Sequence, residues 1–150
     1  MKKYLFMIAL MASVFSFSAC SDDDDEIDVK QLEGTWITTH DEGYSYDEEG
    51  KHPWNFDYDA SNPTTDCEKI VISKISDNTY SVTSYYYYNK WNLDGTDEFT
   101  LEGNKLASED YFDENITARL LSANSKQLII EVKGKDEYGD IYNKKIYKRM

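Results

Sequence analysis

Hydrophobic and polar residues alternate along most of the chain after residue 27, and no segment there shows a long helical period. Alternation places apolar side chains on one face of an extended strand. The pattern predicts a first strand over Leu32–Thr39. Later strands are expected at Lys69–Ile75, Thr79–Trp91, Glu98–Glu102, near Leu106, Ile116–Leu120, Gln127–Lys133 and Ile141–Lys148.

Turn signals separate these segments, among them Asp94-Gly95, which is typical of a two-residue hairpin loop. About eight short strands at this spacing indicate a sandwich or an up-and-down barrel. A meander that closes on itself hides its strand edges. The prediction is therefore an all-β domain over residues 32–150, a small antiparallel up-and-down β-barrel of about eight strands.

Residues 40–66 are polar and aromatic, and they are long for a connection. Turn signals occur at Asp47–Gly50 and Ser61–Pro63. We expect this segment to contain a hairpin of its own or a lid.

The N-terminus has a different pattern. Lys2 and Lys3 precede an apolar run from Tyr4 to Phe17, which is followed by small residues. A basic start, a short apolar stretch and a small residue before the cut are typical of a cleaved signal peptide, here residues 1–19. The alternative, an uncleaved membrane anchor, is disfavoured because a span needs roughly 20 apolar residues.

The residues around Cys20 resemble a lipobox, with Phe17 in place of the usual Leu, then Ser18 and Ala19. The resemblance implies that Cys20 becomes the lipid-modified N-terminus, carrying acyl chains such as palmitate. Several acyl chains give stable membrane anchoring, where one gives only reversible binding. Residues 20–31 are then the lipidated cysteine and an acidic linker.

The run Ser21, Asp22, Asp23, Asp24 and Asp25 repels itself and reads as a solvated spacer. It also resembles the acidic export signal that follows the lipidated cysteine in surface lipoproteins of certain Gram-negative anaerobes. That resemblance implies display at the cell surface, on the outer membrane. A lipoprotein that faces the periplasm is the alternative.

Charge excludes some partners. Removal of residues 1–19 takes away two lysines and no acid, which changes the formal net charge from −13 to −15. Such a chain repels nucleic acid and anionic lipid headgroups. Cys67 has no disulfide partner if Cys20 is acylated, and its neighbours Asp66 and Glu68 favour a small buried residue over a reactive thiol.

The Gly34-Thr35-Trp36 element resembles the Gly-x-Trp signature of lipocalins, in which the tryptophan closes one end of the barrel. The C-terminal part resembles bacterial lipocalin-like lipoproteins through Gly103–Leu106, Leu121–Asn124 and Tyr147–Arg149. This resemblance implies that Arg149 stacks on Trp36 by a cation–π contact. The long acidic segment 40–66 departs from the apolar entrance of a lipid carrier.

Aromatic side chains are the main binding candidates, because 15% of the chain is aromatic. Aromatic faces with polar tips suit flat apolar ligands, glycans or protein partners. The candidate ligand-binding residues are Trp54, Phe56, Tyr86, Tyr88 and Trp91. The alternative is a tyrosine-rich strand stabilised by cross-strand pairs.

Asp57, Asp59, Ser61 and Glu68 have the oxygen spacing of a calcium loop, although Asn62 replaces the invariant glycine. An acidic solvated loop is the favoured interpretation of these residues. His40 and His52 lack further ligands at zinc spacing. We therefore expect no metal and no cofactor.

Three functions remain. The first is an outer-membrane lipoprotein that binds a small hydrophobic or amphipathic ligand in a lipocalin-like barrel. The second is an envelope interaction protein with a filled barrel and an acidic, aromatic outer face. An enzyme ranks last, since no nucleophile–base pair or metal set is evident.

Overall fold

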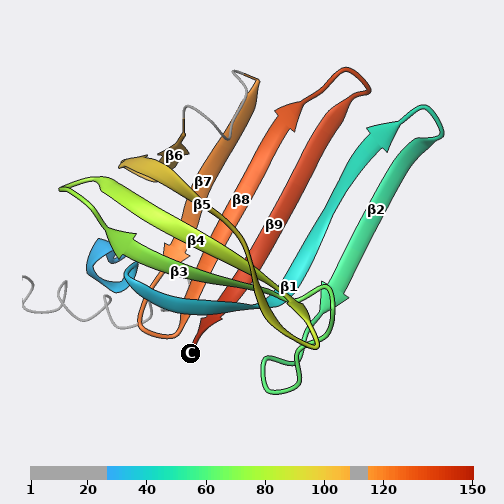
Figure 1. The fold of residues 1–150 in the computed structure, drawn as a ribbon. Coiled ribbons are helices and arrows are strands. Elements are labelled where there is room, and N and C mark those ends of the chain that lie inside the picture. Colours follow the sequence, from blue (N-terminus) through green and yellow to red (C-terminus); the bar gives the residue numbers. More distant parts are fainter. Residues whose placement is uncertain (1–26, 109–114) are drawn as a thin grey trace, which may run out of the picture.

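The computed structural model describes residues 27–108 and 115–150, and this part of the chain is built almost entirely of β-strands (Figure 1). A short 3-10 helix, Val29–Gln31, leads into the first strand. The strands are β1 Gly34–Asp47, β2 Gly50–Asp57, β3 Glu68–Lys74, β4 Thr79–Tyr88, β5 Lys90–Glu102, β6 Lys105–Ala107, β7 Ile116–Ala123, β8 Gln127–Lys135 and β9 Asp140–Arg149. Within these residues no helix is long and apolar enough to cross a membrane. The predicted signal peptide, Cys20 and the run Ser21–Asp25 lie outside the described residues.

The strands close into a ring. β3 to β9 pair in chain order, and β1 pairs with both β3 and β9. All these pairings are antiparallel. The predicted all-β, eight-stranded antiparallel barrel is confirmed, with β2 as an additional strand that pairs with β1 outside the ring.

β1 is longer than predicted, because it continues through residue 47. Its residues 34–37 pair with β3, whereas residues 40–47 pair with β2. A register shift between Thr38 and His40 marks a bulge, which bends a strand. Figure 1 shows the second half of β1 running between β9 and β2, away from β3. Segment 40–66 thus contains a hairpin, one of its two predicted forms.

The predicted hairpin turn at Asp94-Gly95 is wrong. The chain turns at Asn89, whose φ is 60°, and Gly95 lies within β5 opposite Ser84. Asn accepts the left-handed conformation at low cost. The turn at Asn89 places Tyr87 opposite Trp91, with ring centroids 5.2 Å apart in an edge-to-face contact. Asp-Gly is a local turn signal only. Here Asp94-Gly95 lies at a β-bulge within β5, next to the pairing with Ser84, and forms no turn.

One end of the barrel is closed around Trp36, which is fully buried. Its indole Nε1 donates a hydrogen bond to the carbonyl of Leu32 over 2.9 Å. The Arg149 Cζ atom lies 4.3 Å from the Trp36 ring centroid, so the contact that the lipocalin resemblance implies is present. Gly34 has φ +140°, and a Cβ there would lie 2.4 Å from Arg149 Nη1. Glycine therefore allows the arginine to lie across the entering chain.

Candidate ligand-binding cavity

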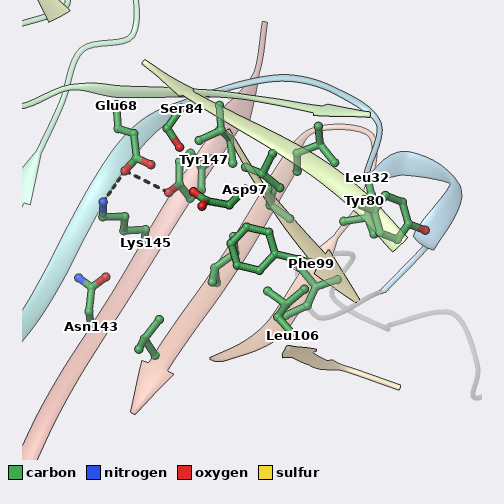
Figure 2. A pocket seen from close by; sticks show the side chains of 17 residues that line it. Leu32, Glu68, Tyr80, Ser84, Asp97, Phe99, Leu106, Asn143, Lys145 and Tyr147 are labelled. Carbon is green, nitrogen blue, oxygen red and sulfur yellow. Dashed lines mark hydrogen bonds and ion pairs between the residues drawn. The ribbon is translucent and has the colours of Figure 1, made fainter. Parts of the chain in front are cut away.

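The barrel encloses a cavity of about 160 Å³ (Figure 2). Its walls come from strands β3 to β9, with Leu32 at the Trp36 end. Much of the surface is apolar, including the side chains of Ile70, Ile72, Val82, Phe99, Leu120 and Ile130. An apolar cavity of about 150 Å³ accommodates benzene, so this space holds a group of that size.

The opposite end of the cavity is polar. Lys145 Nζ forms an ion pair with Glu68 Oε2, and the Tyr147 hydroxyl donates to the same oxygen over 3.4 Å. Figure 2 shows this group on one side of the cavity, with Leu32 and Tyr80 on the other. Lys145 Nζ also lies 3.9 Å from Asp41 Oδ2. The strand pairing brings these two side chains close together, because Lys145 on β9 is directly opposite Asp41 on β1.

Asp97 adds a second carboxylate to the lining. It is opposite Val82 in the β4–β5 ladder, and directly paired residues share a face of the sheet. Within the part of the chain that the structure describes, the Asp97 carboxylate has no hydrogen-bond or ion-pair partner. It is therefore available to a ligand.

Exposure along β4 shows which end of the cavity is open. Tyr80 is 5% exposed, Tyr86 is 47% exposed and Tyr88 is 63% exposed. Tyr86 is paired with Glu68 across β3 and β4, so it lies at the polar end. The cavity thus has an apolar closed end and a polar open end.

None of the five aromatic residues predicted to bind ligand lines this cavity. Tyr86 and Tyr88 continue the inward series of β4, but they extend past the rim and are exposed. Trp91 contacts Tyr87, which alternates with Tyr86 and so faces outward. Trp54 and Phe56 lie on β2, outside the ring. The alternation pattern correctly predicted which face of β4 points into the barrel. It did not predict that the wall opposite β4 ends before it reaches Tyr86 and Tyr88.

Trp54 supports the polar end indirectly. Its Nε1 donates to Asp41 Oδ1 over 2.8 Å, and Asn143 Nδ2 donates to the same atom over 2.6 Å. The ring packs on Gly43, where a Cβ would lie 2.6 Å from Trp54 Cζ2. The β1–β2 hairpin therefore holds Asp41, the second acidic neighbour of Lys145.

The calcium candidate is also corrected, because its four side chains do not converge. Asp57 Oδ1 contacts His40 Nδ1 at 2.7 Å, and Asp59 Oδ1 accepts from the Ser61 backbone and hydroxyl. Glu68 is paired with Lys145. Among the described residues no group of three or more His, Cys, Asp or Glu side chains could hold a metal ion.

Two further residues have defined environments. Cys67 is buried, 1% exposed, and its Sγ accepts a weak hydrogen bond from the Thr64 amide, so the prediction of a small buried residue is confirmed. The hydrogen bond to Asp57, with help from Glu42, raises the pKa of His40 above its ordinary value of 6.5. Burial opposes this shift.

The polar residues of the lining were not predicted from the pattern of the sequence. Asp97 and Lys145 come from β5 and β9, and Glu68 entered only as a calcium candidate. A usable signal exists for Asp97, which precedes the inward residues Phe99 and Leu101 by one alternation step. A polar residue at an inward position marks either a rim or a site.

No family model matches the chain, and no curated protein matches it. Among solved structures, the chain is similar to Ex-FABP, which is described as a siderocalin that functions through dual ligand specificities. The TM-score is 0.51 at 11% sequence identity, and the match covers 80% of this chain and 74% of that chain. At this identity the likeness shows the fold alone. The chain therefore has a lipocalin-like fold, a closed antiparallel barrel.

Proposed function

We propose that this chain is an outer-membrane lipoprotein whose lipocalin-like barrel binds a small hydrophobic or amphipathic molecule. The observation that supports binding is the cavity itself, about 160 Å³, closed at the Trp36 end and open at the Glu68 end. Lipocalin-like barrels can hold one small ligand inside. The apolar body of the ligand packs at the closed end, and its polar group remains at the rim.

A cavity-filling variant tests this role. The mature chain, residues 20–150 with Cys20→Ser so that no lipid is needed, contains every strand of the barrel. We expect it to bind the neutral probe 3-phenyl-1-propanol in isothermal titration calorimetry. Val82→Phe fills the cavity and abolishes binding, whereas Thr83→Phe adds the same ring to the outer face and leaves binding unchanged. Equal binding by both variants contradicts the proposal.

The proposed cellular location rests on the lipobox-like residues around Cys20 and on the acidic run Ser21–Asp25. We propose that Cys20 is acylated and that the barrel is displayed on the cell surface. On this proposal residues 20–31 join the acylated cysteine to the barrel domain, with Ser21–Asp25 as an acidic spacer. Mass spectrometry of the mature protein is expected to find acyl chains on its first residue. A first residue other than an acylated Cys20 refutes the anchoring.

The second candidate function is an envelope interaction protein. Its support is an aromatic group on the outer face, in which Lys69 Nζ lies 4.5 Å from the Tyr85 centroid and 4.8 Å from the Trp91 centroid. The small cavity volume also favours this role, since drug-sized ligand pockets span roughly 300–1,000 Å³. Trp91→Ala separates the two functions, because it removes a partner contact and leaves the cavity intact.

A further inference from the structure

The polar end of the cavity carries more negative than positive charge. Among the lining residues described here, Glu68 and Asp97 are carboxylates and Lys145 is the ammonium. Lys145 already has two acidic neighbours, because Glu68 Oε2 forms its ion pair and Asp41 Oδ2 lies 3.9 Å away. The positive charge of Lys145 is therefore already balanced by carboxylates of the chain itself.

Asp97 is in the opposite situation. Its carboxylate faces the cavity beside Val82 and Phe99, with no partner among the described residues. A carboxylate next to an apolar wall gains a strong, charge-assisted hydrogen bond from a cationic donor. A bound ligand is the available source of that donor.

We propose that the cavity selects amphipathic amines, with the apolar body against Tyr80 and Phe99 toward the closed end and the ammonium group held by Asp97. This inference rests on the proposed function, since it assumes that the cavity takes a small molecule. Glu68 reinforces the preference, because it adds a second carboxylate to the lining of the same cavity.

An amphipathic ligand with a carboxylate head is disfavoured in the same cavity. To reach Lys145 it has to displace Glu68 from an ion pair that Tyr147 also supports. Its own charge then lies near Asp97 in the same cavity, and like charges in a site disfavour one another. The cavity therefore discriminates between heads of opposite charge on the same body.

Three nine-carbon probes test this directly: 3-phenylpropylamine, 3-phenyl-1-propanol and 3-phenylpropionate. They share a phenyl ring that suits the cavity and differ in the charge of the head. Calorimetry at pH 7 and about 0.15 M salt screens attraction to the acidic outer surface beyond roughly 8 Å. The amine is expected to bind at least about tenfold more tightly than the alcohol, and the carboxylate more weakly than the alcohol.

Asp97→Asn removes the charge at nearly constant shape, and Glu98→Gln removes one charge from the neighbouring, exposed position on the outer face. Asp97→Asn is expected to lower amine affinity to about that of the alcohol. Circular dichroism and thermal unfolding show that the variant is folded. Glu98→Gln keeps the full preference for the amine.

The outcomes separate the two proposals. If no probe binds the unmodified barrel, the proposed function and this inference both fail. If the alcohol binds but the amine is no tighter, or the carboxylate is equally tight, the amine preference is overturned and the binding cavity stands. An equal loss of amine affinity in Asp97→Asn and Glu98→Gln also overturns it, because total charge then explains the effect.

Discussion

Arg149 and Trp36 join the last residues of β9 to the start of β1, with the guanidinium carbon 4.3 Å from the indole centroid. Arg149 Nη1 also donates to the Glu33 carbonyl over 2.9 Å, and Nη2 donates to the Gln31 carbonyl. One side chain therefore satisfies two carbonyls of the entering segment and covers the tryptophan that closes the barrel. Figure 1 shows that the C-terminus lies beside this first segment.

Arg149→Ala is expected to destabilise the barrel by about 2–4 kcal/mol, because it removes a cation–π contact and two charge-assisted hydrogen bonds. Urea unfolding followed by tryptophan fluorescence measures the change. Lys148→Ala is the matched control, since its side chain is exposed and lies on the other face of β9. Equal losses in the two variants contradict a special role for Arg149.

Gly34→Ala is expected to cost about 1–3 kcal/mol, since a side chain at φ +140° is strained and its Cβ meets Arg149. Gly95→Ala is the control, because a Cβ there meets no atom within 4 Å. Thermal unfolding of both variants provides the measurement. In the Arg149→Ala background the Gly34→Ala penalty is expected to shrink but not to vanish, because the backbone strain remains. An unchanged penalty argues against the clash.

The His40 ion pair predicts a pH dependence. Because the pKa of His40 is raised in the folded state, its contribution to stability is fully present below pH 6.5 and is lost as the pH rises through the folded pKa. Asp57→Asn is expected to lower this pKa, whereas Asp59→Asn leaves it unchanged. An NMR titration of the His40 ring protons measures the pKa in each variant. A His40 pKa at or below 6.5 in the unmodified chain is the contrary result.

The acidic run gives a prediction about display. If Asp22–Asp25 act as an export signal, replacing all four by Asn leaves Cys20 acylated but prevents protease from reaching the barrel in intact cells. The control for lost charge replaces four exposed acids of the barrel, Asp94, Glu98, Glu102 and Glu137, by their amides. Protease access that is unchanged by the four substitutions indicates that the run is only a spacer.

The sequence predicted the fold well, because alternation, turn residues and Gly34–Trp36 all report local or terminal features. The Asp94-Gly95 turn failed since its propensity competes with the pairing of Tyr87 with Trp91, which depends on strand register. Register between distant strands is not evident in the pattern of a single strand.

The cavity was harder to predict than the barrel. Glu68, Asp97 and Lys145 are far apart in the chain, and only closure of the ring brings them to one end. The predicted aromatic residues do not line the cavity for a related reason, since Tyr86 and Tyr88 extend beyond the rim that distant strands define. Composition drew attention to tyrosines, whereas the polar lining consists of common residue types.

Methyl-group NMR of the mature chain, titrated with 3-phenyl-1-propanol, tests the central claim that the barrel interior binds a small molecule. Methyl groups of Ile70, Val82 and Ile130 line the cavity, whereas Val71 alternates with Ile70 and faces outward. We expect saturable shifts and ligand contacts at the three cavity residues and none at Val71. Shifts confined to outer residues such as Val71 and Leu93, or no saturable shift at all, would contradict the account.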